Sequence, residues 1–186
     1  MTSVVGQVSI KTATSNWQAA KANAALPGGA SIRTGQRSKA AIRYTSGTVA
    51  RLGANTVLRI KSEDASNVKL VKGKTYVNKQ KDGKTMKVKT PNAVATVLGT
   101  ELFVSHNETT GTSHVTTLNG SVEVMTDQGE KAMVESGFWV EIEQGKPLEV
   151  PTKFDWNQLK KKERFLLDPN FVPSDDESWA DSEDWH

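Results

Sequence analysis

The stretch AAIRYTSGTVARLGANTVLRI (40–60) has the clearest strand pattern in the sequence. Within it, apolar residues alternate with polar ones in three short runs, which is the period-two pattern of half-buried β-strands. Turn-forming residues separate the runs, at Ser46-Gly47 and at Gly53-Ala54-Asn55. Glycine and asparagine tolerate the positive φ angles that tight turns need. The stretch therefore predicts three consecutive strands joined by tight turns.

The same pattern continues on both sides of this stretch, from about residue 28 to residue 150. Turn pairs recur at intervals of roughly 8 to 12 residues, among them Asp82-Gly83, Asn119-Gly120 and Gln128-Gly129. No long run with a helical period interrupts the strands, which disfavours a parallel sheet with crossover helices. We therefore predict an all-β domain over residues 1–150, built as a stack of short strands that is solenoid-like or jelly-roll-like.

Alternation also assigns a face to each side chain of a strand. We expect the aliphatic residues, together with Tyr44 and Tyr76, to point into the core. The basic residues between them then point outward, and stacked strands would bring them together on one outer face. We predict that this basic strip binds an anionic partner; the alternative is a solvated sheet face on which lysines discourage edge-to-edge pairing. The strip consists of Arg43, Arg51, Arg59, Lys69, Lys87 and Lys89.

The segment 151–168 has a helical pattern. Asp155 is placed to cap the helix N-terminus, and Trp156, Leu159 and Leu166 fall on one apolar side. We predict a short amphipathic helix that ends before Pro169.

Residues 169–186 form an acidic, aromatic tail, whose last sixteen residues carry six acids and no lysine or arginine. A segment so poor in aliphatic residues cannot bury enough surface to order itself, so we expect it to be disordered. Trp179 and Trp185 are candidate anchors in a partner's groove, since tryptophan is enriched at binding hot spots. The alternatives are that the tail folds back onto the basic strip, or that it only aids solubility.

The net charge of +3 conceals a strong gradient along the chain. Residues 1–90 carry 17 lysines and arginines against three acids, whereas residues 91–150 carry two against nine. Such segregation creates a local field that attracts anionic partners to the first half of the chain.

Composition excludes several classes of protein. The chain of 186 residues has no cysteine, so a disulfide scaffold, a thiol nucleophile and cysteine-ligated metal centres are ruled out. It has no apolar run long enough to cross a membrane as a helix and no secretory signal at its start. Its length suits one domain with a tail.

Catalytic and metal-binding patterns are not evident. His106 and His114 fall on neighbouring predicted strands, and a two-histidine metal site would need a further ligand and supporting hydrogen bonds. We interpret both as surface histidines of a hairpin. The glycines of PGGAS (27–31) lack the lysine and helix of a phosphate loop. We therefore predict no enzyme activity, no metal and no cofactor.

Several sequence pieces occur in order along the first 150 residues. They are VVGQVSI (4–10) followed by Trp17, LPGGASIRTGQRSKAAIRYTSGTVARLGANTVLRI (26–60), VKLVKGKTYV (68–77), VKTPNAVATVLGTELFV (88–104) and TTLNGSVEV (116–124). Taken as an ordered set, they resemble a FecR domain.

This resemblance implies an all-β stack of short strands and an extracytoplasmic role in bacterial signalling or at the cell envelope. In transmembrane FecR proteins the domain relays a signal from an outer-membrane receptor to a cytoplasmic sigma factor. The sequence given has no membrane helix, so we expect a stand-alone, periplasmic or otherwise extracytoplasmic binding or signalling module. A protein or an anionic wall polymer is the expected partner.

Two alternative functions stay open. One is the extracytoplasmic sensor domain of a FecR-type sigma-factor regulator. The other is a basic nucleic-acid-binding module, which the scarcity of aromatic platforms in the basic half disfavours.

Overall fold

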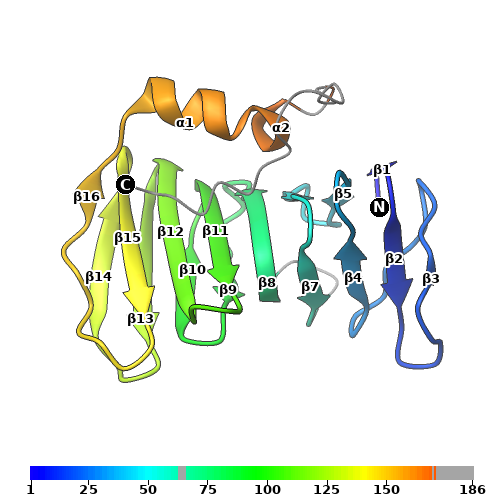
Figure 1. The fold of residues 1–186 in the computed structure, drawn as a ribbon, viewed down its shortest axis with the longest axis horizontal. Coiled ribbons are helices and arrows are strands. Elements are labelled where there is room, and N and C mark those ends of the chain that lie inside the picture. The colour runs from blue at the N-terminus through cyan, green and yellow to red at the C-terminus, as the bar shows by residue number, and fades with distance from the viewer. Residues whose placement is uncertain (63–65, 169, 171–186) are drawn as a thin grey trace.

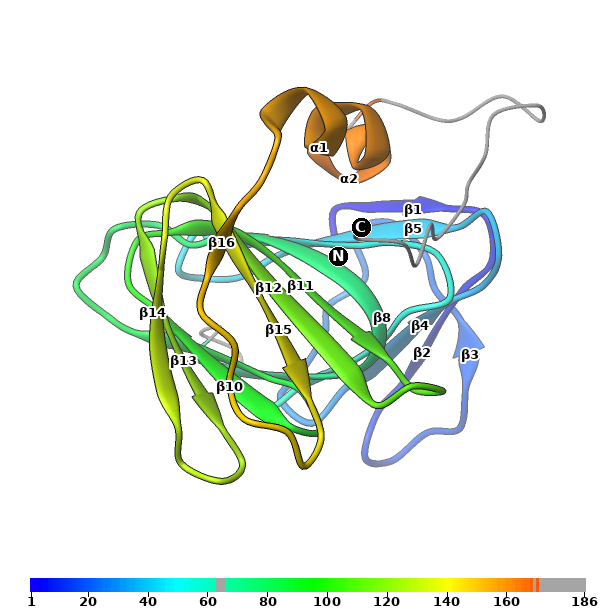
Figure 2. The same cartoon turned by 60° about the vertical axis from the view of Figure 1, so that its left-hand side comes forward.

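Strands with one apolar face must bury that face against another element, and here two sheets bury their apolar faces against each other. The computed structural model describes residues 1–62, 66–168 and 170. Figures 1 and 2 show the two facing sheets, with a helical segment outside one of them. The all-β fold is therefore confirmed.

Sheet A contains eight strands, the longest of which, β8, enters it with its second half. Their order across the sheet is β1 (Ser3–Val5), β5 (Lys39–Arg43), β6 (Val49–Leu52), β8 (Asn67–Asn78), β11 (Glu101–Asn107), β12 (Thr112–Asn119), β15 (Phe138–Glu143) and β16 (Thr152–Lys153).

Sheet B contains nine strands, including the first half of β8. Their order is β3 (Gln18–Ala19), β2 (Val8–Lys11), β4 (Ser31–Thr34), β7 (Val57–Ile60), β8, β9 (Met86–Lys89), β10 (Ala93–Val97), β13 (Ser121–Thr126) and β14 (Lys131–Glu135). Neighbouring strands are antiparallel in both sheets, except for β8 and β9.

The order of strands across each sheet follows the order of the chain, apart from the first hairpin of sheet B. Successive hairpins alternate between the sheets and advance along the long axis of the molecule, from β1 and β2 at one end to β14 and β15 at the other (Figure 1). Of the two arrangements that the sequence predicted, this sequential stacking is the solenoid-like one.

The inward and outward assignments hold for most strands. The aliphatic residues predicted to face the core are buried between the sheets, as Ile42, Leu52, Leu58, Leu70 and Val88 illustrate.

Tyr76 is an exception, because it faces outward from sheet A. A bulge in the pairing of β7 with β8 shifts the register between Val57 and Leu58. An extra residue in one strand reverses the faces of all residues after it. Thr75 and Val77 therefore point inward, and Tyr76 lies on the outer face beside Arg51 and Phe103.

The C-terminal segment forms two short helices, α1 (Trp156–Lys162) and α2 (Arg164–Leu167). The predicted N-cap is present, since an Asp155 carboxylate oxygen accepts hydrogen bonds from the backbone N–H groups of Asn157 and Gln158. The helices lie over the outer face of sheet A, near one end of its strands (Figure 2). No helix in the described part of the chain is long and apolar enough to cross a membrane.

Gly73 makes the transfer of β8 between the sheets possible. Its φ is +85°, and a Cβ atom there would lie 2.4–2.9 Å from atoms of Thr56, including the Thr56 Cα. Gly129 has the same φ of +85°, but nothing lies within 4 Å of the position of its Cβ. Replacing each glycine by alanine therefore distinguishes the energetic cost of a positive φ, present at both positions, from the cost of a steric clash, present only at Gly73.

We predict that Gly73→Ala lowers the free energy of unfolding by about 3 kcal/mol, because it adds a clash to a strained angle. Gly129→Ala should cost only about 1 kcal/mol, the penalty of the left-handed angle. Urea denaturation of both variants measures the difference. Equal losses would show that the close approach to Thr56 does not constrain β8.

Candidate binding surfaces

The six residues of the predicted basic strip all have outward-facing side chains, but they do not share one face. Arg43 and Arg51 lie on sheet A, whereas the other four lie on sheet B. The expectation of a single strip is therefore wrong. The chain passes from sheet A to sheet B between β6 and β7. Alternation with a period of two shows whether a side chain faces the core or the solvent, but it does not show to which sheet the strand belongs.

On sheet B, three of the four cations are direct neighbours across the strands. Arg59 of β7 is paired in register with Lys69 of β8, which is paired with Lys89 of β9. Adjacent strands lie about 4.8 Å apart, so the three side chains form a row perpendicular to the strands. Lys87 lies two residues from Lys89 on the same face of β9.

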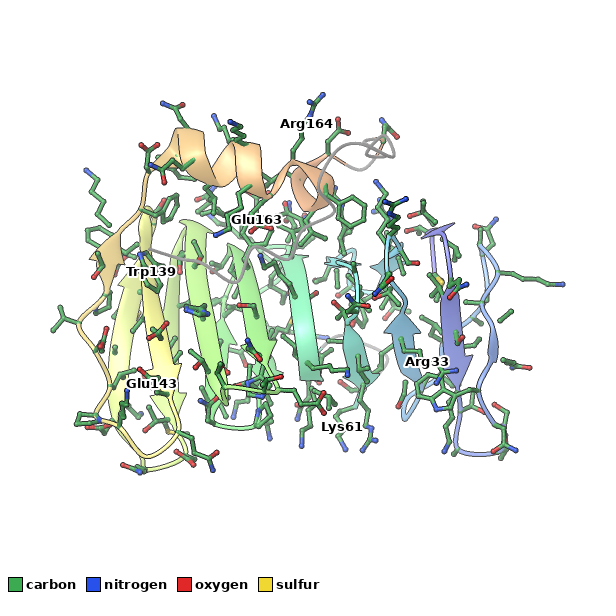
Figure 3. All side chains as sticks on the ribbon, viewed as in Figure 1. Arg33, Lys61, Trp139, Glu143, Glu163 and Arg164 are labelled. Carbon is green, nitrogen blue, oxygen red and sulfur yellow. The ribbon has the colours of Figure 1, made fainter. Side chains whose placement is uncertain are left out.

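Further cations extend this surface. Lys11 continues the row through Ser31, which is paired with Arg59. Arg33 points outward from β4, and its guanidinium lies 4.5 Å from the centre of the Trp17 ring. Figure 3 shows Arg33 and Lys61 toward the same end of the strands. Sequence analysis missed Arg33, although the alternation in SIRT (31–34) gives it the same outward position as Arg43.

Few of the carboxylates that the structure describes lie near these cations. Among the described residues, none forms an ion pair with Arg59, Lys69, Lys87 or Lys89. Glu123 on β13, an acid on the outer side of sheet B, lies 3.6 Å from the ammonium group of Lys131. We call the outer surface of sheet B around Arg59, Lys69, Lys87 and Lys89 the basic face.

Like charges in register across strands destabilise a sheet. We therefore predict that Lys69→Gln raises the free energy of unfolding by about 0.5 kcal/mol at low salt. The gain should vanish at about 1 M salt, where screening acts within roughly 3 Å. Lys153→Gln, at an exposed position on β16, is the control and should change little. A loss of stability in Lys69→Gln would mean that the cations of the row do not repel each other.

On sheet A, Arg51 is already engaged by the chain itself. Its Nη1 donates hydrogen bonds of 2.9 Å to the carbonyl oxygens of both Leu166 and Leu167, at the end of α2. Its guanidinium carbon lies 4.9 Å from the centre of the Tyr76 ring. Arg43 remains exposed at the end of β5. The position of Arg51 favours a role in holding the helical segment.

Two lysines that the sequence analysis missed also contact this segment. The ammonium group of Lys74 lies 2.6 Å from a carboxylate oxygen of the buried Glu163. That of Lys39 lies 4.9 Å from the centre of the Phe165 ring, and burial lowers the pKa of Lys39. The role of Lys39 could have been predicted, because Lys39 lies four residues before Arg43 on the same strand and therefore faces the same side of the sheet. The role of Lys74 could not have been predicted, because the bulge in β8 reverses the side on which Lys74 lies.

The two histidines lie on opposite faces of sheet A. Ser113 pairs with His106, and Ser105 pairs with His114, so the two rings cannot share a metal ion. Both residues are buried, with exposed fractions of 6% and 9%, which corrects the prediction of surface histidines. Within the described residues, no group of three or more potential ligands could hold a metal.

Each histidine has polar partners. His106 Nδ1 lies 2.9 Å from the Ser113 hydroxyl, which donates to Asn92 Oδ1 at 2.6 Å. His114 Nε2 lies 2.6 Å from a carboxylate oxygen of Glu141. Burial lowers the pKa of both histidines, against the opposing effects of Glu108 on His106 and of Glu141 on His114.

The lowered pKa of His106 makes stability depend on pH. Because the folded state disfavours the protonated ring, the unfolded state binds more protons once the pH falls below the ordinary histidine pKa of about 6.5. Stability is thus fully present above that pH and is lost as the pH falls. We predict a shallower loss in His106→Asn, whose amide can still bond to Ser113. Urea denaturation between about pH 7.5 and 5 measures the slopes, and parallel curves would contradict the prediction.

The proposed anchors Trp179 and Trp185, and the acidic tail around them, lie outside the described residues.

Comparison with known proteins shows one family and one fold. The family model described as FecR protein matches residues 30–123, which run from the start of β4 into β13. No curated protein matches the chain. Two crystal structures of a proposed anti-sigma factor from Parabacteroides distasonis ATCC 8503 have a similar fold, with TM-scores of 0.63 and 0.62 at 21% sequence identity. The matches cover 73% and 70% of this chain but only 64% and 62% of that protein.

Proposed function

Because the chain belongs to the FecR family, we propose that it is an extracytoplasmic signalling domain of the bacterial cell envelope that acts by binding and not by catalysis. Its partner in this proposal is a protein with an acidic surface, and the basic face of sheet B is where that protein docks. In this role the chain serves as the sensor part of a FecR-type regulator. The similar fold of a proposed anti-sigma factor supports a regulatory role.

The observation that carries the proposed docking site is the row Arg59, Lys69 and Lys89. Three cations in register on successive strands cost stability, and the described carboxylates do not neutralise them. An acidic partner surface would relieve this repulsion on binding. Charge complementarity of this kind mainly raises the association rate and selects the partner.

The test measures binding of the full chain to three immobilised polyanions, at about 50 and 200 mM salt, a range in which contacts made purely by charge weaken steeply. Poly-L-glutamate represents an acidic protein surface, purified bacterial cell wall represents the wall polymer, and duplex DNA represents nucleic acid. The four-site variant Arg59→Gln, Lys69→Gln, Lys87→Gln, Lys89→Gln removes the basic face. Its control carries Lys21→Gln, Lys146→Gln, Lys153→Gln and Lys161→Gln, which remove the same charge from exposed positions elsewhere.

We expect poly-L-glutamate to bind the unmodified chain and the control alike, and the four-site variant at least tenfold more weakly. Equal binding by both variants would refute the basic face as the docking site. Tighter binding to the wall would replace the protein partner by a wall polymer. Tighter binding to DNA than to poly-L-glutamate would indicate a nucleic-acid-binding protein and would overturn the proposed extracytoplasmic location.

A further inference from the structure

We propose that the outer face of sheet A is a binding site for an amphipathic helix of a partner protein, and that the chain's own helical segment, residues 154–168, occupies this site in competition with it. The inference adds a second surface on the sheet opposite the basic face. It rests on the proposed function only in taking the partner to be a protein.

Three residues of the helical segment are fully buried against the sheet. Leu159 of α1, Glu163 between the two helices and Leu166 of α2 follow one another at spacings of four and three residues, the spacings at which side chains of a helical segment lie on one side. Their exposed fractions are only 3%, 4% and 2%. Figure 3 shows Glu163 pointing toward the sheet and the adjacent Arg164 pointing away from it.

The apolar part of the site is separate from the core between the sheets. Leu159 and Leu166 pack with Tyr76, Phe103 and Leu118 in a cluster distinct from the main core. Removing the segment would therefore uncover two aromatic rings without opening the sandwich. Exposing such an apolar patch to water costs free energy. When the segment leaves, the face is therefore more stable covered by another helix than exposed to water.

The polar part of the site recognises a helix end through atoms that any helix has. Arg51 donates to the last carbonyl oxygens of α2, which lack partners within the helix. Lys74 binds the Glu163 carboxylate one turn earlier, at 2.6 Å. The guanidinium of Arg51 is itself supported by the Tyr76 ring.

These contacts define the partner helix by its chemistry. It carries an apolar residue, an acidic residue four positions later and a second apolar residue three positions after that, and it ends within the following turn. In the chain's own segment, Phe154, Phe165 and Leu167 are half-buried against the same cluster, so the partner helix also carries apolar residues beside these three.

The connection to the sandwich is long enough for the segment to leave. Residues 144–155 join β15 to α1 with only the two-residue strand β16 between them. Val150, in the middle of this connection, is 84% exposed. Because the segment is tethered, its effective concentration at the site is of the order of millimolar, and a free peptide competes poorly until the tether is cut.

The test uses the full chain with a protease recognition sequence inserted between Gly145 and Lys146, cut after purification. Fluorescence anisotropy then measures binding of a labelled peptide with the sequence 154–168. Two variant peptides are compared with it: Glu163→Ala, which removes the buried carboxylate, and Lys161→Ala, which changes an exposed position. A fourth peptide keeps the buried Leu159, Glu163 and Leu166, the half-buried Phe154, Phe165 and Leu167, and the helix end, on an alanine–lysine background.

We expect the cut chain to bind the labelled peptide at least tenfold more tightly than the uncut chain does. The Lys161→Ala peptide should bind as well as the parent, the Glu163→Ala peptide at least tenfold more weakly, and the fourth peptide within tenfold of the parent. Failure of the peptide to exchange into the cut chain would make the segment a permanent part of the fold and overturn the inference. So would equal binding of the two alanine peptides, or failure of the fourth peptide to bind. None of these outcomes depends on the basic face, so this test and that of the proposed function fail independently.

Discussion

The strand β8 passes from one sheet to the other and so belongs to both. The first half of β8 pairs with β7 and β9 in sheet B, and its second half pairs with β6 and β11 in sheet A. A single strand thus fixes how the two sheets face each other. The bulge beside β7 turns Tyr76 outward, and Tyr76 in turn supports both Arg51 and the helical segment. A local irregularity of the backbone therefore shapes the face on which the helical segment packs.

Most of the fold could be predicted from the sequence, because alternation and glycine-containing turns are local signals. Residues such as Ile42 and Leu58 face the core as predicted, and Asp155 caps the helix. What the pattern could not supply was the sheet to which each strand belongs, because both sheets share one core and obey the same period. Arg43 and Arg59 look alike in the sequence and lie on opposite sides of the molecule.

The candidate sites were predictable only in part, for a related reason. The outward orientation of Lys69 and Lys89 follows from their own strands, but their pairing in register depends on the parallel contact between β8 and β9. The role of Arg51 depends on carbonyl groups more than one hundred residues away, at Leu166 and Leu167. The burial of His106 and His114 likewise comes from neighbours across the sheet and not from their own surroundings in the sequence.

The sequential order of strands has a consequence for how the chain folds. The residues paired between strands are at most 38 positions apart, as in Ser3 and Ala41, so each pairing closes a short loop and the cost in chain entropy stays small. Folding can then spread outward from the middle, as in repeat proteins. A hairpin could also be added at either end without changing the existing strand pairings. The contact of Arg51 with Leu166 instead spans 115 positions. Docking of the helical segment therefore joins two parts of the chain that strand pairing leaves far apart in sequence.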